Sequence, residues 1–211
     1  EDFLERNAHL PEYLARAVAW LYGSVFCPFI EFLTRPNWLL IILFILLYKF
    51  GDAVLTVMKI PFFLELGFSN TEIGTIAKLV GFPPIIIGGL FGGLLLAKTG
   101  IMRGLLISGI FMAASNLVFV LQSWVGYSQE MLAVTIAIEN FTTSMGTVAF
   151  VAYLSSLCNI AYTATQYALL TSFMAFSRTV MTSGSGWVAD QVSWPVFFML
   201  TTLAALPGLI L

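Results

Sequence analysis

Six apolar segments, each close to the length needed to cross a lipid bilayer, account for most of this sequence. They lie at residues 38–58, 72–97, 104–122, 131–157, 166–188 and 196–211. A helix needs about 20 mainly apolar residues to span the hydrocarbon core. The connections are short, so consecutive segments are expected to be antiparallel neighbours. The sequence therefore predicts an all-α integral membrane protein with six transmembrane helices.

The composition agrees with a membrane environment. Of 211 residues, 59% are hydrophobic and only 9% are charged, whereas soluble domains carry about 25% charged residues. This excludes a soluble enzyme, a nucleic-acid binder and a disordered tail. The formal net charge of −2 gives no field that would attract a polyanionic partner.

Metal and thiol chemistry find little support in the sequence. His9 is the single histidine, and Cys27 and Cys158 lie far apart. They form neither a disulfide framework nor a CxxC pair, and a zinc or nucleophile–histidine site would rest on one isolated residue. We expect no metal, no cofactor and no enzymatic activity. A membrane-embedded acyltransferase, the alternative from another class, lacks a credible nucleophile–base pair.

Residues 1–36 differ from the rest of the chain because they hold three of the nine basic and five of the eleven acidic residues. Apolar residues at helical spacing between Leu14 and Val25 predict an amphipathic helix. The uncharged run 17–30 is short for a span and contains Pro28. We predict a cytoplasmic or interfacial lead-in at 1–36 and a six-helix bundle at 37–211, with a degenerate extra span as the alternative. The chain has no basic n-region before an apolar stretch, so we expect no signal peptide. It lacks an initiator Met and ends inside an apolar segment, so we expect it to be part of a longer protein.

Lysine and arginine residues near the ends of the segments predict the orientation, because cytoplasmic loops carry an excess of them. The side that holds the N-terminal tail carries five basic residues: Arg6, Arg16, Arg35, Lys98 and Arg103. The opposite side of the membrane carries Lys59 alone. We therefore expect both ends of the chain in the cytoplasm.

Ionisable residues inside the apolar segments are the main functional signal, because each costs several kcal/mol in hydrocarbon. Lys49 and Asp52 share one helix face at i, i+3, and Glu139 and Asn140 lie in the middle of the fourth segment. The face of Glu139 continues through Thr142, Thr143 and Gly146. Arg178 lies near the middle of the fifth segment, and Lys78 lies in the outer part of the second.

Charges from several helices at one depth favour a shared polar cavity, with helix-to-helix ion pairs as the alternative interpretation. Asp52 and Glu139, with Asn140 beside them, are candidates for proton coupling. Lys49, Lys78 and Arg178 are candidates for binding substrate carboxylates. Three cations against two anions leave a formal charge of +1, which favours an anionic ligand.

The second segment also carries signals for close helix packing and bending. Gly88-Gly89 and Gly92-Gly93 form two overlaid GxxxG spacings, which allow close helix approach. Pro83-Pro84 removes backbone hydrogen bonds and is expected to bend this helix.

The connection after this segment resembles the cytoplasmic loop motif of the major facilitator superfamily, G-x-x-x-D-[RK]-x-G-x-[RK]-[RK]. Ala97 replaces the acidic residue and Met102 replaces one basic residue. The matching positions, which the resemblance assigns to a gating loop, are Gly93, Lys98, Gly100 and Arg103.

A more extensive resemblance runs from about Val25 to Leu211, to the C-terminal half of AmpG-type muropeptide permeases within that superfamily. The matching stretches are Pro28-Phe29 with Phe32, Arg35 and Trp38, then 47–53, 139–141, 145–147, 149–152 and 163–170, then Arg178, Gly186-Trp187 and Trp194-Pro195. The stretch 163–170 is the most specific of them.

The resemblance implies proton-driven import of anhydro-muropeptides from periplasm to cytoplasm, across the bacterial inner membrane. This flux belongs to cell-wall recycling and feeds β-lactamase induction. It further implies one six-helix half of a transporter whose other half is a partner, or self-pairing of this half. A same-fold transporter of acetyl-CoA or another anionic solute is one alternative. A non-transporting remnant or partner half is another.

Overall fold

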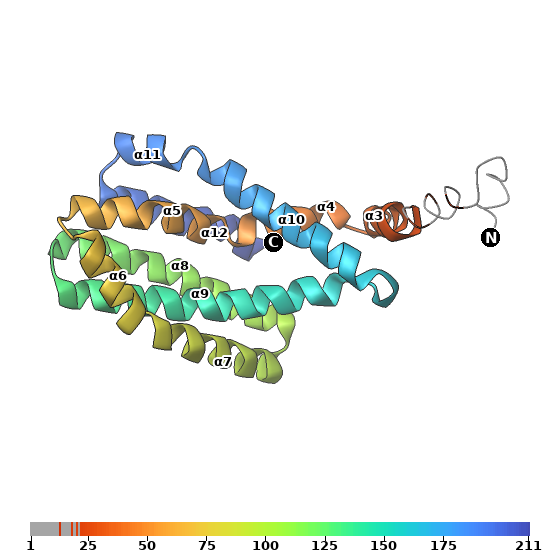
Figure 1. Ribbon diagram of the computed structural model, residues 1–211, viewed down its shortest axis with the longest axis horizontal. Coiled ribbons are helices and arrows are strands. Elements are labelled where there is room, and N and C mark those ends of the chain that lie inside the picture. Colours follow the sequence, from red (N-terminus) through yellow and green to blue (C-terminus); the bar gives the residue numbers. More distant parts are fainter. Residues whose placement is uncertain (1–12, 14–17, 19, 21) are drawn as a thin grey trace.

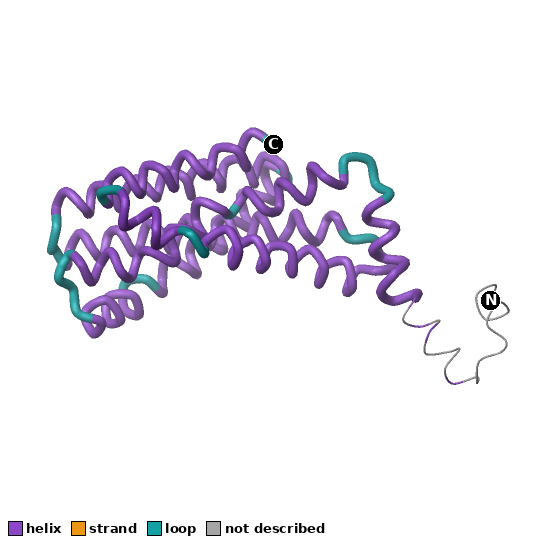
Figure 2. The backbone as a smooth tube through the Cα atoms, turned by 90° about the horizontal axis from the view of Figure 1, so that it is seen from above, coloured by secondary structure: helices purple, strands orange, loops and turns teal. Residues whose placement is uncertain are grey.

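The computed structural model describes Tyr13, Val18, Trp20 and residues 22–211, and its ordered elements are all helical. The expectations for Arg6, His9, Leu14 and Arg16 lie outside the described residues. The elements are η1 (Tyr22–Phe26), α3 (Cys27–Leu33), α4 (Trp38–Tyr48), α5 (Phe50–Glu65), α6 (Asn70–Leu79), α7 (Phe82–Thr99), α8 (Ile101–Val125), α9 (Gln129–Leu157), η2 (Ile160–Tyr162), α10 (Thr163–Thr182), α11 (Ser185–Gln191) and α12 (Trp194–Ile210). The long helices run side by side along one axis (Figures 1 and 2).

Each of the six predicted segments is helical, which confirms a mostly helical membrane protein. Among the described residues, four helices are long and apolar enough to cross a membrane: Trp38–Glu65, Phe82–Thr99, Ile101–Val125 and Gln129–Leu157. Trp194–Ile210 is shorter, and α10 is separated from α11 by Ser183 and Gly184. The count of six spans therefore stays a prediction. Tyr22–Leu33, in the lead-in, also belongs to the shorter apolar helices.

Three predicted boundaries were wrong. The first segment continues through Lys59 to Glu65, so Lys59 lies within a helix and not in a connection. The second segment is interrupted at Val80 and Gly81, just before two prolines that cannot donate backbone hydrogen bonds. The fifth is interrupted at Ser183 and Gly184.

Glycines set the close approach of α7 to α9, as the GxxxG spacings predict. A Cβ atom on Gly88 would lie 2.2 Å from the carbonyl oxygen of Phe141, and one on Gly92 would lie 3.0 Å from that of Met145. The side chain of Ser144 adds a hydrogen bond across this interface, donating to the Ile85 carbonyl at 2.7 Å. These contacts make α7 and α9 a tightly packed pair.

Two apolar clusters fill the bundle on either side of its polar middle. One is rich in aromatic rings, with Phe62 at its centre in contact with Phe63, Phe119 and Phe198. The other surrounds Tyr48, whose ring stacks on Phe150 at 5.1 Å between centroids. Polar side chains in the middle of the bundle are thus held between packed apolar layers.

Candidate functional site

Polar side chains of α5 and α9 face one another along the middle of the bundle. Lys59 Nζ donates to Glu139 at 2.9 Å, Thr143 Oγ1 donates to Asp52 Oδ1 at 2.8 Å, and Lys49 Nζ donates to Thr147 Oγ1 at 2.8 Å. The α9 members recur every four residues, which places them on one helix face. Their partners on the α5 side run in the opposite order, as antiparallel helices require. We call this set the α5–α9 seam.

The charges of the seam are paired and buried to different degrees. The Glu139 side chain is 4% exposed, and its partner Lys59 is 23% exposed. Lys49 and Asp52, which share a helix face as predicted, approach to 3.7 Å. A buried carboxylate needs such a partner because desolvation of an isolated charge costs several kcal/mol.

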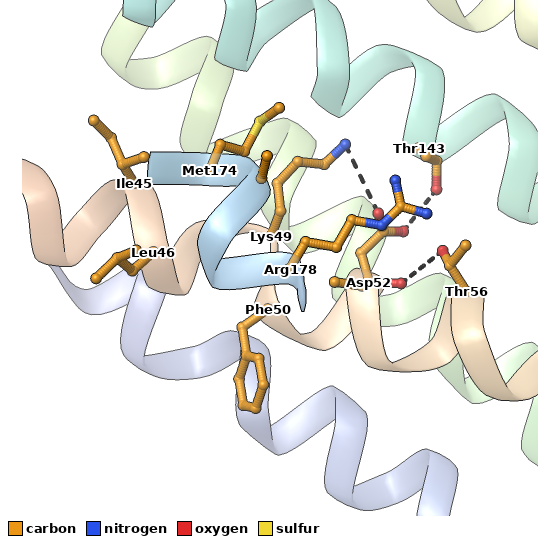
Figure 3. A pocket seen from close by; sticks show the side chains of 11 residues that line it. Ile45, Leu46, Lys49, Phe50, Asp52, Thr56, Thr143, Met174 and Arg178 are labelled. Carbon is orange, nitrogen blue, oxygen red and sulfur yellow. Dashed lines mark hydrogen bonds and ion pairs between the residues drawn. The ribbon is translucent and has the colours of Figure 1, made fainter. Parts of the chain in front are cut away.

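A cavity of about 290 Å³ opens beside the seam, between α4, α5, α9 and α10. Its polar lining comes from Lys49, Asp52, Thr56, Thr143 and Arg178. Figure 3 shows Lys49 and Arg178 extending from different helices toward the space around Asp52. The structure thus brings together three residues that the sequence analysis assigned to one polar cavity.

Arg178 differs from the other charges of the cavity. Its side chain is exposed, and the described residues include no ion pair or hydrogen bond to its guanidinium group. Arg178 and Lys49 against Asp52 give the lining a formal charge of +1. An anionic group entering the cavity would therefore find an uncompensated cation.

Glu139 and Asn140 occupy different places from the cavity wall. Glu139 pairs with Lys59 one helical turn from Thr143. Asn140 Nδ2 donates to the Gly81 carbonyl at 3.0 Å, where the second segment is interrupted. Asn140 therefore holds the α6–α7 break and does not line the cavity.

The remaining predicted residues lie away from the cavity. Lys78 is exposed in the last turn of α6 and is not part of its lining. Gly93 lies within α7 against open space, and Gly100, at the α7–α8 junction, has a φ of +80°. Lys98 and Arg103, on either side of Gly100, are exposed, and neither has an ion pair within the described part of the chain.

Lys59 is a site residue that hydropathy does not reveal, because a lysine at the end of an apolar run is expected in a connection. The helical spacing carried the signal. Lys49, Asp52, Thr56 and Lys59 recur at i, i+3, i+7 and i+10, which marks one face of a single helix.

Sequence comparisons identify relatives of the chain, although no family model matches it. It is 38% identical over 192 residues to a transporter of Rickettsia felis named AmpG 4, covering 91% of this chain. It is also 38% identical over 192 residues to the anhydromuropeptide permease of Escherichia coli K12, covering 90% of this chain. The chain is a relative of the AmpG-type permeases.

A third relative, named AmpG 3, comes from Rickettsia typhi and is 41% identical over 165 residues. These matches confirm the resemblance drawn from the motifs, and the names are those of transporters and permeases. The chain covers 46% of the Rickettsia felis protein and 39% of the Escherichia coli protein. It thus spans less than half the length of these AmpG-type permeases.

Proposed function

We propose that the chain is part of a secondary active transporter that imports anhydro-muropeptides from the periplasm to the cytoplasm, driven by protons. The uncompensated Arg178 beside Lys49 in a cavity of the bundle carries this proposal, because it suits a substrate with carboxylate groups. The name of the Escherichia coli relative supports the choice of substrate. A link to β-lactamase induction would follow from that flux.

The residues of the site divide into two roles in this proposal. Arg178 and Lys49 bind a substrate carboxylate, and Lys78 acts outside the cavity during substrate approach. Asp52 and Glu139 couple transport to protons, since each carboxylate contacts a lysine. Protonation of the carboxylate would leave that lysine free to pair with an anionic substrate. Gly93, Lys98, Gly100 and Arg103 form a gating loop at one end of α7.

The proposed placement is the bacterial inner membrane, with both ends of the chain in the cytoplasm, residues 1–36 as a lead-in and residues 37–211 as the C-terminal bundle. With Lys59 inside a helix, the sequence count becomes five basic residues on the cytoplasmic side and none on the other. This supports the orientation.

Transport by alternating access requires a second bundle against which this one moves. Because the chain spans less than half of its relatives, we propose that it pairs with an N-terminal half or with a second copy of itself. A non-transporting remnant or partner half is the alternative that this length favours.

Uptake of labelled anhydro-muropeptide tests the proposal in cells that lack their own permease and express only this chain. Membrane insertion is measured separately. Uptake that a protonophore abolishes, and that Asp52→Asn removes without loss of insertion, is the expected result. Unchanged proton-driven uptake by Asp52→Asn contradicts the coupling role.

No uptake despite insertion contradicts transport by this chain alone. Co-expression with an N-terminal half then distinguishes a chain that lacks its partner from a non-transporting remnant. Labelled acetyl-CoA in the same assay separates the alternative substrate.

A further inference from the structure

A polar cluster, separate from the α5–α9 seam and its cavity, joins α3 to the neighbouring ends of α9 and α10. It consists of Glu31 and Arg35, which lie on and just after α3, and Gln166 in the first turn of α10. Gln166 is fully buried at 0% exposure. Figure 1 shows α3 beside the ends of α4 and α10. We call these residues the Glu31–Arg35–Gln166 cluster.

Through one side-chain amide, Gln166 contacts α3, the segment just after α3 and the α9–η2 connection. Its Nε2 donates to the Pro28 carbonyl at 3.2 Å and to the Glu31 carboxylate. Its Oε1 accepts from the Asn159 backbone at 2.7 Å and from Arg35 Nη2 at 3.3 Å. The amide therefore uses both of its donor hydrogens and both acceptor sites. A buried group bonded in this way resists displacement, because each lost partner leaves a desolvated polar atom.

Arg35 completes the connection to α9. It forms an ion pair with Glu31 at 2.7 Å and donates to the carbonyl of Leu157, the last residue of α9. A cation at a helix C-terminus is favoured by the helix dipole. Desolvation raises the pKa of Glu31, but hydrogen bonds and charge from Arg35, with hydrogen bonds from Gln166 and Asn159, outweigh it and hold this pKa below its usual value. Glu31 thus stays charged at neutral pH.

The middle of α10 is less buried than its two ends, although Phe173 and Met174 pack against the apolar cluster around Tyr48. Among the described side chains of residues 171–181, none is buried, whereas Leu170 is fully buried and Thr182 is buried. This middle part carries Met174, Ala175 and Arg178 to the cavity. Arg178 lies about 18 Å beyond Gln166 along the same helix, at about 1.5 Å per residue. The place of Arg178 therefore depends in part on how the two ends of α10 are held.

We propose that Gln166 is a positioning residue that fixes α10 to α3 and α9, and thereby sets the place of Arg178 in the cavity. The cluster makes α3 and α10 move together. A displacement of α3 would therefore also displace the part of α10 that lines the cavity. The consequence for substrate affinity rests on the proposed function. The structural linkage itself does not.

Electron spin resonance distances test the linkage in the full chain in lipid, with Cys27 and Cys158 replaced by alanine. One label pair joins Phe176 on α10 to Ile110 on α8. A reference pair joins Leu94 on α7 to Ile110. All three labelled positions are exposed. Gln166→Met removes the amide while keeping the side-chain length, so the 176–110 distances are expected to broaden or shift while the reference distances stay unchanged.

Two further variants keep the test specific to the cluster. Ser172→Ala removes a hydrogen bond that stays within α10, to the Ala168 carbonyl at 2.7 Å, and is expected to leave both distances unchanged. The double variant Glu31→Gln with Gln166→Glu returns a carboxylate to Arg35 and an amide donor to position 31, and is expected to narrow the 176–110 distribution again. Unchanged 176–110 distances in Gln166→Met overturn the proposal, as does equal broadening of the reference pair.

Uptake kinetics separate this proposal from the proposed function. In a transporting assembly, Gln166→Met is expected to raise the KM for anhydro-muropeptide more than it lowers kcat. If the parent chain and its pairings transport nothing, the proposed function fails while the distances still decide the positioning role. If kcat alone falls and the distances are unchanged, the positioning role is overturned.

Discussion

At the residue scale, the Lys59–Glu139 pair has the most deeply buried carboxylate among the ion pairs of the described residues. Glu139 is nearly inaccessible, and its carboxylate depends on one lysine for compensation. Lys59 is less buried and its long stem allows the charge to reach a more polar level. The two partners therefore do not contribute equally, and removing one is not equivalent to removing the other.

We predict that Lys59→Met destabilises the protein more than Glu139→Gln does. Breaking a buried pair costs about 3–5 kcal/mol. Glu139→Gln leaves Lys59 unpaired, and because Lys59 is partly exposed, we expect this loss of stability to lie at or below the lower end of that range. The double variant is expected to be more stable than Lys59→Met, because no unpaired charge remains. Thermal unfolding in detergent measures all three. Glu65→Gln, an exposed carboxyl at the end of α5, is the control. A double variant no more stable than Lys59→Met contradicts the pairing argument.

Another carboxylate, Glu72, is stabilised at the edge of the bundle, outside the four membrane-capable helices. It accepts hydrogen bonds from Tyr127 at 2.5 Å, from Gln129 at 2.7 Å and from the backbone and hydroxyl of Ser69. The hydrogen bond from Tyr127, followed by those from Ser69 and Gln129, lowers the pKa of Glu72 to about 2. This contact fixes the start of α6 to the α8–α9 connection.

We predict a pH dependence of stability from Glu72. A carboxyl whose pKa is lower in the folded state stabilises that state fully above its unfolded pKa, and this stabilisation is lost as pH falls through the folded value. The stability difference between the native chain and Glu72→Gln should thus be largest above about pH 4.5 and should vanish toward pH 2. Thermal unfolding across this range measures the difference. A stability difference that stays constant with pH would show that the ionised Glu72 carboxylate does not cause it. Tyr127→Phe, which removes one hydrogen bond to this carboxylate, should reduce the stability difference.

At the element scale, the sequence predicts those features of the fold that depend on average hydropathy and on the spacing of residues within one segment. The sequence alone predicts the six helical segments, the close approach at Gly88 and Gly92, and the shared helix face of Lys49 and Asp52. Helix breaks near Pro83 were expected only as a bend. Lys59 was misplaced because its partner is 80 residues away on α9, and hydropathy along one segment contains no information about that contact. The docking of Arg35 on α9 and α10 depends on tertiary contacts in the same way.

The α7–α9 pair provides a test of element packing with a matched control in one helix. Gly88→Ala puts a methyl group 2.2 Å from the Phe141 carbonyl oxygen, whereas a Cβ on Gly93 meets nothing within 4 Å. Overpacking costs about 1–3 kcal/mol, so Gly88→Ala should be clearly destabilising. Gly93→Ala should be neutral or stabilising by up to about 1 kcal/mol through helix propensity. Thermal unfolding in detergent compares them. Equal effects of the two changes would show that α7 and α9 are not in close contact at Gly88.

At the scale of the whole molecule, the α5–α9 seam, the cavity and the Glu31–Arg35–Gln166 cluster form one arrangement. The α7–α9 pair is tightly packed, and α10 carries Arg178 to the cavity while its own middle is little buried. Paired charges line the α5 side of the cavity, and the Arg178 guanidinium, which has no ion pair among the described residues, lies on the less buried part of α10. An anionic group bound between Lys49 and Arg178 would therefore connect the two sides and restrict the movement of α10.

This arrangement predicts that charge inside the cavity, and not total charge, determines anion binding. Arg178→Gln changes the formal charge of the lining from +1 to zero, and Lys78→Gln removes the same charge from an exposed position outside it. We expect Arg178→Gln to weaken binding of labelled anhydro-muropeptide to the purified chain in lipid nanodiscs roughly tenfold, which is about 1.4 kcal/mol. Lys78→Gln should leave binding nearly unchanged, and Arg178→Lys should retain part of it. Because the Arg178 guanidinium has no hydrogen bond or ion pair among the described residues, its replacement should not lower the unfolding temperature. Equal weakening by Arg178→Gln and Lys78→Gln would mean that the anion responds to the overall charge of the protein and does not enter this cavity.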